Sequence, residues 1–390
     1  MHKRPRRRWA RAAGVLAAML VPGGLLGQTC ERTITADVVA LDQAIFYNRL
    51  GAHDPAGMMF ALKRDVVPLS GSSLGAGNVR LRDGLRPRPL TLRANEGDCL
   101  KITFTNLLSS TPKSNQPGTR DASIHVMGMQ LVGGIASDGS FVGQNASSLV
   151  APGGTATYTL HAVKEGTFLL YSTAQTTGGD GDGGTISKGL FGAVNVEPKG
   201  AEWYRSQLTA EEMKLASAGT TAGGQPIVNY DALYPSGHPR AGLPILKMLH
   251  NGEVVHSSLT AIITGPNRGP FPAGTYPQVV VNRDRHQPFR EVTVIFHDEP
   301  GLVQAFNDIF DDPRFEHTLH SGRDAFAINY GTGGIGAEVL GNRFGVGPMG
   351  ECTECKYEEF FLSSWAVGDP AMLVDVPADF DGNGDGQPDA

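Results

Sequence analysis

Glu96-Gly-Asp-Cys-Leu-Lys-Ile-Thr-Phe-Thr-Asn106 is the stretch that decides the fold. Its apolar residues Leu100, Ile102 and Phe104 alternate with polar ones, and a Gly-Asp turn precedes them. This alternation is typical of a β-strand that buries one face. Similar short segments, bounded by Gly, Pro, Asn or Asp, lie at 33–47, 90–93, 122–126, 155–161, 166–172 and 191–196. Many strands at short spacing, without helical periodicity between them, predict an all-β sandwich.

A second β region follows the first. Its predicted strands lie at 278–282, 290–297, 325–330, 358–365 and 372–376. A helical or linker segment at 202–216 separates the two regions, and a helical insertion is expected around 303–310. We therefore expect two sandwich domains, residues 28–200 and 201–376, with long loops and a short helical linker.

The composition supports a turn-dense β protein and excludes one class of partner. The chain of 390 residues holds 51 glycines and 25 prolines, and only 18% of its residues are charged. Its net charge is −6, and its basic cluster lies within the first eleven residues. Nucleic acid is therefore not an expected partner.

The N-terminus has the pattern of a signal peptide. Lys3, Arg4 and 6–8 form a positive segment, and the apolar run 12–26 is interrupted by Pro22 and two glycines. That run is too short and too broken to span a bilayer comfortably. We expect cleavage near residue 27, export to the periplasm or the extracellular space, and no stable membrane insertion afterwards. A twin-arginine signal and a short amphipathic membrane anchor are the alternatives.

Four cysteines follow the predicted signal peptide: Cys30, Cys99, Cys352 and Cys355. An even number in an exported protein favours disulfides. Pairing of Cys30 with Cys99 would tie the mature N-terminus to a strand, but four cysteines allow three connectivities. Cys352 and Cys355 form a loop disulfide, half of a zinc or copper(I) site, or a pair of free thiols. His317 and His320 would supply the other half of that site.

The C-terminal tail, residues 377–390, resembles part of a calcium-binding loop. Oxygen ligands stand at positions 1, 3, 5 and 9 of the loop pattern: Asp381, Asn383, Asp385 and Asp389. Gly386 occupies position 6, where such a loop turns sharply. The sequence predicts either a calcium site or a hydrophilic tail.

Three more histidines invite a structural or a functional interpretation. His297 ends an apolar strand and is either a hydrogen-bonded strand-end residue or a ligand or general base. His250 and His256 flank an Asn-Gly turn, and we expect both on the surface of a hairpin.

Four segments of the first domain together resemble multicopper oxidases. They are the strand 96–108, Ile124-His125-Val126-Met127-Gly128, Gly166-Thr-Phe-Leu-Leu-Tyr171-Ser172-Thr173 and Gly189-Leu-Phe-Gly-Ala-Val-Asn-Val196. Less sharply, 201–207, 294–299, 327–331 and 358–370 are similar to the N-terminal part of the large bacterial multicopper oxidases linked to manganese oxidation. The resemblance implies two cupredoxin-like Greek-key β-sandwich domains, copper in the full-length family, and further cupredoxin domains or subunits as partners.

The copper ligands are where the sequence departs from that family. A His-x-His pair places both imidazoles on one face of a strand. His125 and Met127 stand at the first such pair of the family, and Tyr171 and Thr173 stand at the second. His125 and Met127 are therefore degenerate copper positions, and this segment alone should lack a complete copper site.

Three functions fit these observations. The first is the N-terminal, non-copper-binding portion of an oxygen-reducing oxidase that acts on Mn(II), Fe(II) or another small substrate. The second is a catalytically inactive cupredoxin-fold protein with a binding or structural role. The third is a small metal carrier that uses Cys352, Cys355, His317 and His320.

Overall fold

A computed structural model of the chain describes the residues that form the fold. These are 29–47, 52–112, 119–141, 145–174, 184–206, 208–220, 226–264, 289–298, 300–301, 303–304, 313, 326–329 and 386.

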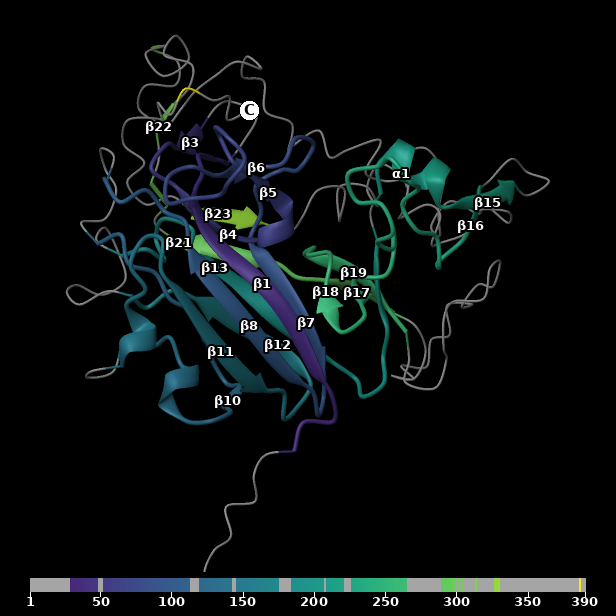
Figure 1. Cartoon of the computed structure of the whole chain (residues 1–390), viewed down its shortest axis with the longest axis horizontal. Coiled ribbons are helices and arrows are strands. Elements are labelled where there is room, and N and C mark those ends of the chain that lie inside the picture. Colours follow the sequence, from purple (N-terminus) through teal and green to yellow (C-terminus); the bar gives the residue numbers. More distant parts are fainter. Residues whose placement is uncertain are drawn as a thin grey trace, which may run out of the picture.

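The first sheet is built around β1 (Thr33–Asp42) and β8 (Cys99–Asn106). These two strands pair in parallel over eight residues, from Thr33↔Cys99 to Ala40↔Asn106. The sheet order is β10-β11-β8-β1-β18-β17, and β4 also pairs with β1 (Figure 1). The bounds of these other strands are β4 (Met58–Leu62), β10 (Gln130–Leu131), β11 (Thr155–His161), β17 (Leu249–His250) and β18 (Glu253–Val254).

The second sheet has the order β7-β13-β12-β9. Its strands are β7 (Leu90–Asn95), β13 (Phe191–Glu197), β12 (Gly166–Tyr171) and β9 (His125–Val126). β13 runs parallel to β7 and antiparallel to β12, and the short β9 closes this side of the sheet. The candidate copper positions of the sequence therefore lie at β9 and at the end of β12.

The main core lies between the two sheets. Alternate residues of β1, from Ile34 to Ala40, face this core and are fully buried. Phe104 of β8 contacts the ring of Phe60 edge-on, and Leu92 and Leu170 enter the same cluster from the second sheet. Complete burial of one such side chain is worth roughly 1.5–3 kcal/mol. The prediction of an all-β sandwich in the first half of the chain is thus confirmed.

Residues 201–264 pack partly on the same core. β14 (Trp203–Arg205) and β19 (Thr260–Ile263) form a small sheet with β20 (Phe289–Val292). Trp203 and Ile263 belong to the core of the sandwich, and β18 extends its first sheet. The division of the chain near residue 200 stays a prediction, since most of 265–376 lies outside the described residues.

A second, smaller core surrounds helix α1 (Ala210–Leu215). Only this part of the expected segment 202–216 is helical, because Trp203 and Tyr204 are buried in a strand instead. Thr209 and Glu212 form a capping box at the start of the helix. The buried Arg205 donates to both carboxylate oxygens of Glu212, at 2.9 and 3.0 Å, and so fastens the helix to β14.

Short elements complete the described fold. The strands are β2 (Ile45–Phe46), β3 (Ala52–Asp54), β5 (Val66–Val67), β6 (Arg80–Leu81), β15 (Ser217–Thr220), β16 (Pro226–Val228), β21 (Ile295–Asp298), β22 (Val303–Gln304) and β23 (Phe326–Asn329). Three 3-10 turns lie at Lys63–Asp65, Ile135–Ser137 and Ala146–Ser148. The predicted helical insertion at 303–310 begins with β22, and its remainder lies outside the described residues. Within the part of the chain that the structure describes, no helix has the length and hydrophobicity of a membrane span.

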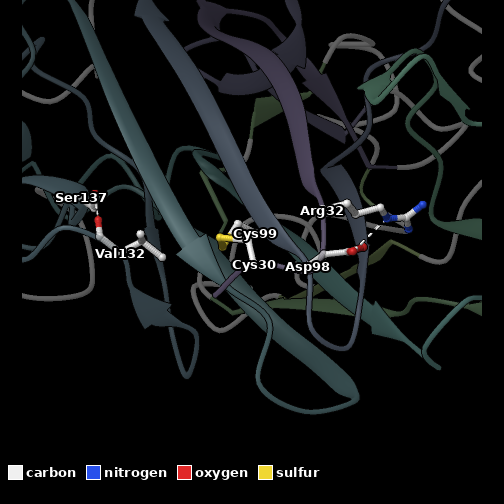
Figure 2. Close-up of a disulfide and its surroundings, with 6 residues drawn as sticks. All are labelled: Cys30, Arg32, Asp98, Cys99, Val132 and Ser137. Atoms are coloured by element: carbon white, nitrogen blue, oxygen red, sulfur yellow. Dashed lines mark hydrogen bonds and ion pairs between the residues drawn. A yellow bond between two sulfur atoms is a disulfide. The ribbon is translucent and has the colours of Figure 1, made fainter. Parts of the chain in front are cut away.

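A disulfide joins Cys30 to Cys99 at the start of β8 (Figure 2). Beside it, Arg32 donates to Asp98 at 2.8 Å, so the chain entering β1 is fastened to the turn before β8 twice. The disulfide adds a covalent link to a parallel pair, whose two strands no tight turn can connect. The predicted pairing of Cys30 with Cys99 is thus present, and Cys352 and Cys355 lie outside the described residues.

The hairpin of β17 and β18 corrects one expectation. Asn251 and Gly252 form its turn, and both have positive φ. His250 lies on this hairpin, half-buried. His256, by contrast, is 5% exposed and contacts the carbonyl of Pro244 through Nε2 at 2.7 Å. The prediction that His256 lies on the surface was wrong, because the chain turns inward after β18 toward the second core.

Candidate functional site

The register of β9 and β12 brings the family's ligand positions to one face of the second sheet. His125 pairs directly with Tyr171, and Val126 with Leu170. Val126 and Leu170 enter the core. Because side chains alternate along a strand, His125 and Tyr171 point away from the core. Met127, two residues after His125, lies on the same face. The pairing with β12 extends to it, because its N–H donates to the carbonyl of Leu169 at 2.9 Å.

A carboxylate holds His125. Its Nδ1 lies 2.6 Å from Oδ1 of Asp138, and Tyr171 contacts the imidazole ring edge-on. Asp138 also accepts hydrogen bonds from the backbone N–H of Ser140 at 3.0 Å and from its hydroxyl. Burial alone would raise the pKa of Asp138, but the hydrogen bonds from Ser140 and His125 outweigh it and lower the pKa. Asp138 is therefore an ionised anchor for the histidine.

Gly139 lets the loop that carries Asp138 lie directly against β9. A Cβ atom at this position would be 2.2 Å from the carbonyl oxygen of Ile124, so any side chain would push the loop away. The carbonyl of Gly139 accepts a hydrogen bond from the Thr173 hydroxyl at 2.7 Å. The loop therefore occupies the position where Thr173 and His125 approach each other.

The donor set does not fit the copper cluster that the family implies. Of the four positions, only His125 offers an imidazole, and Asp138 contacts its Nδ1. The Thr173 hydroxyl bonds to a backbone carbonyl, the Tyr171 ring packs against His125, and Met127 is 52% exposed. A trinuclear centre requires several converging imidazoles. Among the described residues, no group of three or more His, Cys, Asp or Glu side chains could hold a metal ion.

The other predicted sites lie outside the described residues. This holds for Cys352, Cys355, His317 and His320, and for Asp381, Asn383, Asp385 and Asp389. The possible zinc or copper(I) site and the possible calcium loop therefore stay predictions.

His297 lies in β21 and packs edge-on against Phe191. Its Nε2 is buried and, within the described part of the chain, has no hydrogen-bond partner. Burial lowers the pKa of His297, and the opposing contributions of the Ser187 backbone and Asp54 do not cancel this effect. His297 is thus a neutral side chain in a strand.

The sequence analysis missed Asp138 as the partner of His125. Thirteen residues separate the two, and a loop with two backbone turns lies between them. The one available signal was the sequence Asp138-Gly139-Ser140, a turn pattern in which a short acidic side chain bonds to nearby backbone. That signal predicts a turn and does not name the histidine.

Comparison with known proteins agrees with the resemblance over this domain. A sequence model of the family described as "Multicopper oxidase" matches residues 76–201. This range is about a third of the chain and includes His125, Asp138, Tyr171 and Thr173. No curated protein sequence matches the chain. Residues 76–201 are therefore similar in sequence to multicopper oxidases.

Solved structures of multicopper oxidases are also similar to the chain. The enzyme from Pseudomonas thermotolerans shares 19% identity over 45% of this chain and 32% of its own, with a TM-score of 0.25. Another multicopper oxidase shares 26% identity over 43% and 42%, with a TM-score of 0.26. The blue copper oxidase from Nitrosomonas europaea shares 20% over 43% and 40%, with a TM-score of 0.25. The matched part spans less than half the length of each.

Proposed function

We propose that the chain is the copper-free sandwich portion of an exported, oxygen-reducing metal oxidase of the multicopper oxidase type. In this proposal, other cupredoxin domains or subunits supply the copper centres. The substrate would be a reducing metal ion, Mn(II) or Fe(II). The match over residues 76–201 supports the oxidase ancestry. The manganese-oxidase resemblance of the sequence suggests the substrate.

One observation carries the copper-free part of the proposal. At the four positions where the resemblance implies histidines, only His125 is an imidazole, and its Nδ1 contacts Asp138 at 2.6 Å. The loop around Gly139 and Thr173 then fills the adjoining position with hydrogen-bonded backbone. A carboxylate-bound imidazole is a common second contact of metal-ligating histidines, so this geometry is a remnant of such a site. Without further imidazoles, the remnant performs no oxygen reduction.

Oxygen consumption tests the proposal. The 390-residue chain, loaded with copper, is compared with the protein purified from its own cells, with Mn(II) or Fe(II) as the electron donor. We expect no metal-dependent oxygen uptake by the chain alone and clear uptake by the native assembly. Uptake by the chain alone would show that it holds its own copper centre.

The second candidate is a binding or structural protein that catalyses nothing. Two apolar side chains, Met127 and Leu169, are exposed on the same face of the sheet as His125. They favour this alternative, because exposed apolar side chains are suited to contact with another protein. A native assembly without copper and without oxygen uptake would select this candidate over the oxidase.

A further inference from the structure

A buried charged cluster connects the second sheet to β20. Arg93 comes from β7, Glu197 from β13 and Glu291 from β20. Their side chains are 1%, 3% and 17% exposed. Charged side chains are rarely buried to this extent unless their charges are compensated.

Glu291 receives most of the hydrogen bonds in this cluster. Its Oε1 accepts from Nε of Arg93 at 2.9 Å and from Nδ2 of Asn195 at 2.6 Å. Arg93 also donates through Nη1 to the carbonyl of Ser258 at 2.8 Å, and Asn195 donates to the Thr293 hydroxyl at 2.8 Å. These bonds connect β7 and β13 to Ser258, to β20 and to Thr293. An acceptor that receives a guanidinium and an amide is best suited to the ionised state.

Glu197, in contrast, receives no hydrogen bond from Arg93. Its Oε1 lies 3.6 Å from Nε of Arg93, beyond hydrogen-bonding distance, and is buried without a hydrogen-bond partner. Both carboxyl groups lie against the same guanidinium, since Nε of Arg93 is 2.9 Å from Oε1 of Glu291 and 3.6 Å from Oε1 of Glu197. A single guanidinium compensates one buried carboxylate, and a second ionised carboxylate would keep an uncompensated buried charge, so one of the two groups carries a proton. One guanidinium, one carboxylate and one carboxylic acid give a cluster with no net charge.

We propose that Glu197 keeps one proton in the folded protein and donates it to Glu291 in a hydrogen bond. Attachment of β20 to the second sheet is then strongest in acid and weakens as the pH rises. The junction between the second sheet and β20 is thus proton-dependent.

The charges around the pair agree with this assignment. Burial, followed by the negative charge of Glu291, raises the pKa of Glu197 to about 9, against the opposing effect of Arg93. Glu165 adds a further negative charge on the same side. Burial would also raise the pKa of Glu291, but Arg93 and the hydrogen bonds from its neighbours lower it instead.

The direction of the pH effect follows from proton linkage. The pKa of Glu197 is raised in the folded state, so folding takes up a proton between the unfolded value of 4.5 and the folded value of about 9. The stabilisation is complete below pH 4.5 and is lost progressively up to about pH 9. Each pH unit in this window changes the unfolding equilibrium constant by up to tenfold.

The first test compares Glu197→Gln with the wild-type chain by equilibrium unfolding from pH 5 to pH 9. The amide of glutamine can donate to Glu291 as the carboxylic acid does, but it does not titrate. We expect the two unfolding constants to be similar near pH 5 and to separate as the pH rises, with the variant the more stable. Glu211→Gln, on the exposed face of α1, is the matched control and should follow the wild type. Parallel curves for Glu197→Gln and the wild type would overturn the proposal.

The second test asks which carboxyl group holds the proton. Glu291→Gln removes the charged partner of the buried Arg93, so we expect it to destabilise the chain at every pH. Infrared spectroscopy in D₂O should detect the carbonyl band of a buried carboxylic acid at pH 7 in the wild type. The band should be absent in Glu197→Gln. Its persistence in that variant would contradict the assignment, as would equal destabilisation by the two substitutions at pH 8.

Discussion

The imidazole of His125 and the carboxylate of Asp138 are in contact, with Nδ1 2.6 Å from Oδ1. Asp138 is also bonded to Ser140, and its own carbonyl accepts from Asn145 at 2.6 Å and Ser147 at 2.7 Å. The loop therefore depends on this residue. Replacement of Asp138 by alanine keeps the backbone carbonyl but removes the carboxylate that contacts His125 and accepts from the N–H and hydroxyl of Ser140.

We expect Asp138→Ala to lower the free energy of unfolding by about 1–3 kcal/mol. Chemical denaturation at neutral pH measures this change. The variant Asp138→Asn keeps the shape of the side chain but removes its negative charge. Because the pKa of Asp138 is lowered in the fold, its stabilising contribution is present above its ordinary value of 3.8 and is lost as the pH falls below it.

The wild type should therefore lose stability in acid more steeply than Asp138→Asn. The control is Asp37→Asn, an exposed position of β1. An Asp138→Asn variant with the acid sensitivity of the wild type would show that the carboxylate is not an ionised anchor.

His256 gives a second prediction at the scale of single residues. Burial, followed by the charge of Arg205, lowers its pKa well below 6.5. The folded chain therefore holds this imidazole neutral while the unfolded chain protonates it, and stability falls as the pH drops below 6.5. His256→Gln should remove this component of the pH dependence between pH 6.5 and 5. His250→Gln, across the same hairpin turn, should keep it; equal effects would contradict the assignment.

Some of these residue-scale features could be predicted from the sequence, and others could not. The placement of His125 in a strand could be predicted, because the segment 122–126 has the pattern of a strand. The burial of His256 was not predictable, because it depends on the path of the chain after β18. Arg93 was visible as a charge within an apolar strand, but its partner Glu291 lies 198 residues away.

Among the strands, the parallel pair β1 and β8 is central to the first sheet. Their sequences indicated strands, since apolar residues alternate in both. The pairing itself could not be predicted, because parallel strands are joined by long connections that leave no local signal. In contrast, the hairpin of β17 and β18 was predictable from Asn251-Gly252. Only part of 202–216 formed a helix, because burial of Trp203 and Tyr204 in a strand prevailed over local helix preference.

The disulfide between Cys30 and Cys99 should matter most to this parallel pair. Its sequence separation of 69 residues implies a loss of unfolded-state entropy worth about 4 kcal/mol. We expect reduction to lower the free energy of unfolding by up to this amount, measured by urea denaturation with and without reductant. The double variant Cys30→Ser/Cys99→Ser should match the reduced wild type. Equal stability of oxidised wild type and double variant would contradict this role.

At the scale of the whole molecule, the described residues form a β-sandwich, part of which is similar in sequence to multicopper oxidases, with an additional region attached to it. The attachment uses apolar contacts of Trp203 and Ile263 and the buried cluster of Arg93, Glu197 and Glu291. The sandwich therefore has a sequence similar to multicopper oxidases over residues 76–201, with only one imidazole at the four positions where the resemblance implies histidines.

The copper content of the wild-type chain and of His125→Ala shows most directly whether the His125 face holds a copper centre. Both proteins are loaded with copper, dialysed and analysed for metal by mass spectrometry. We predict the same copper content in both, because the His125 face holds no copper centre. A wild type that carries several tightly bound copper ions, lost together in His125→Ala, would contradict the account.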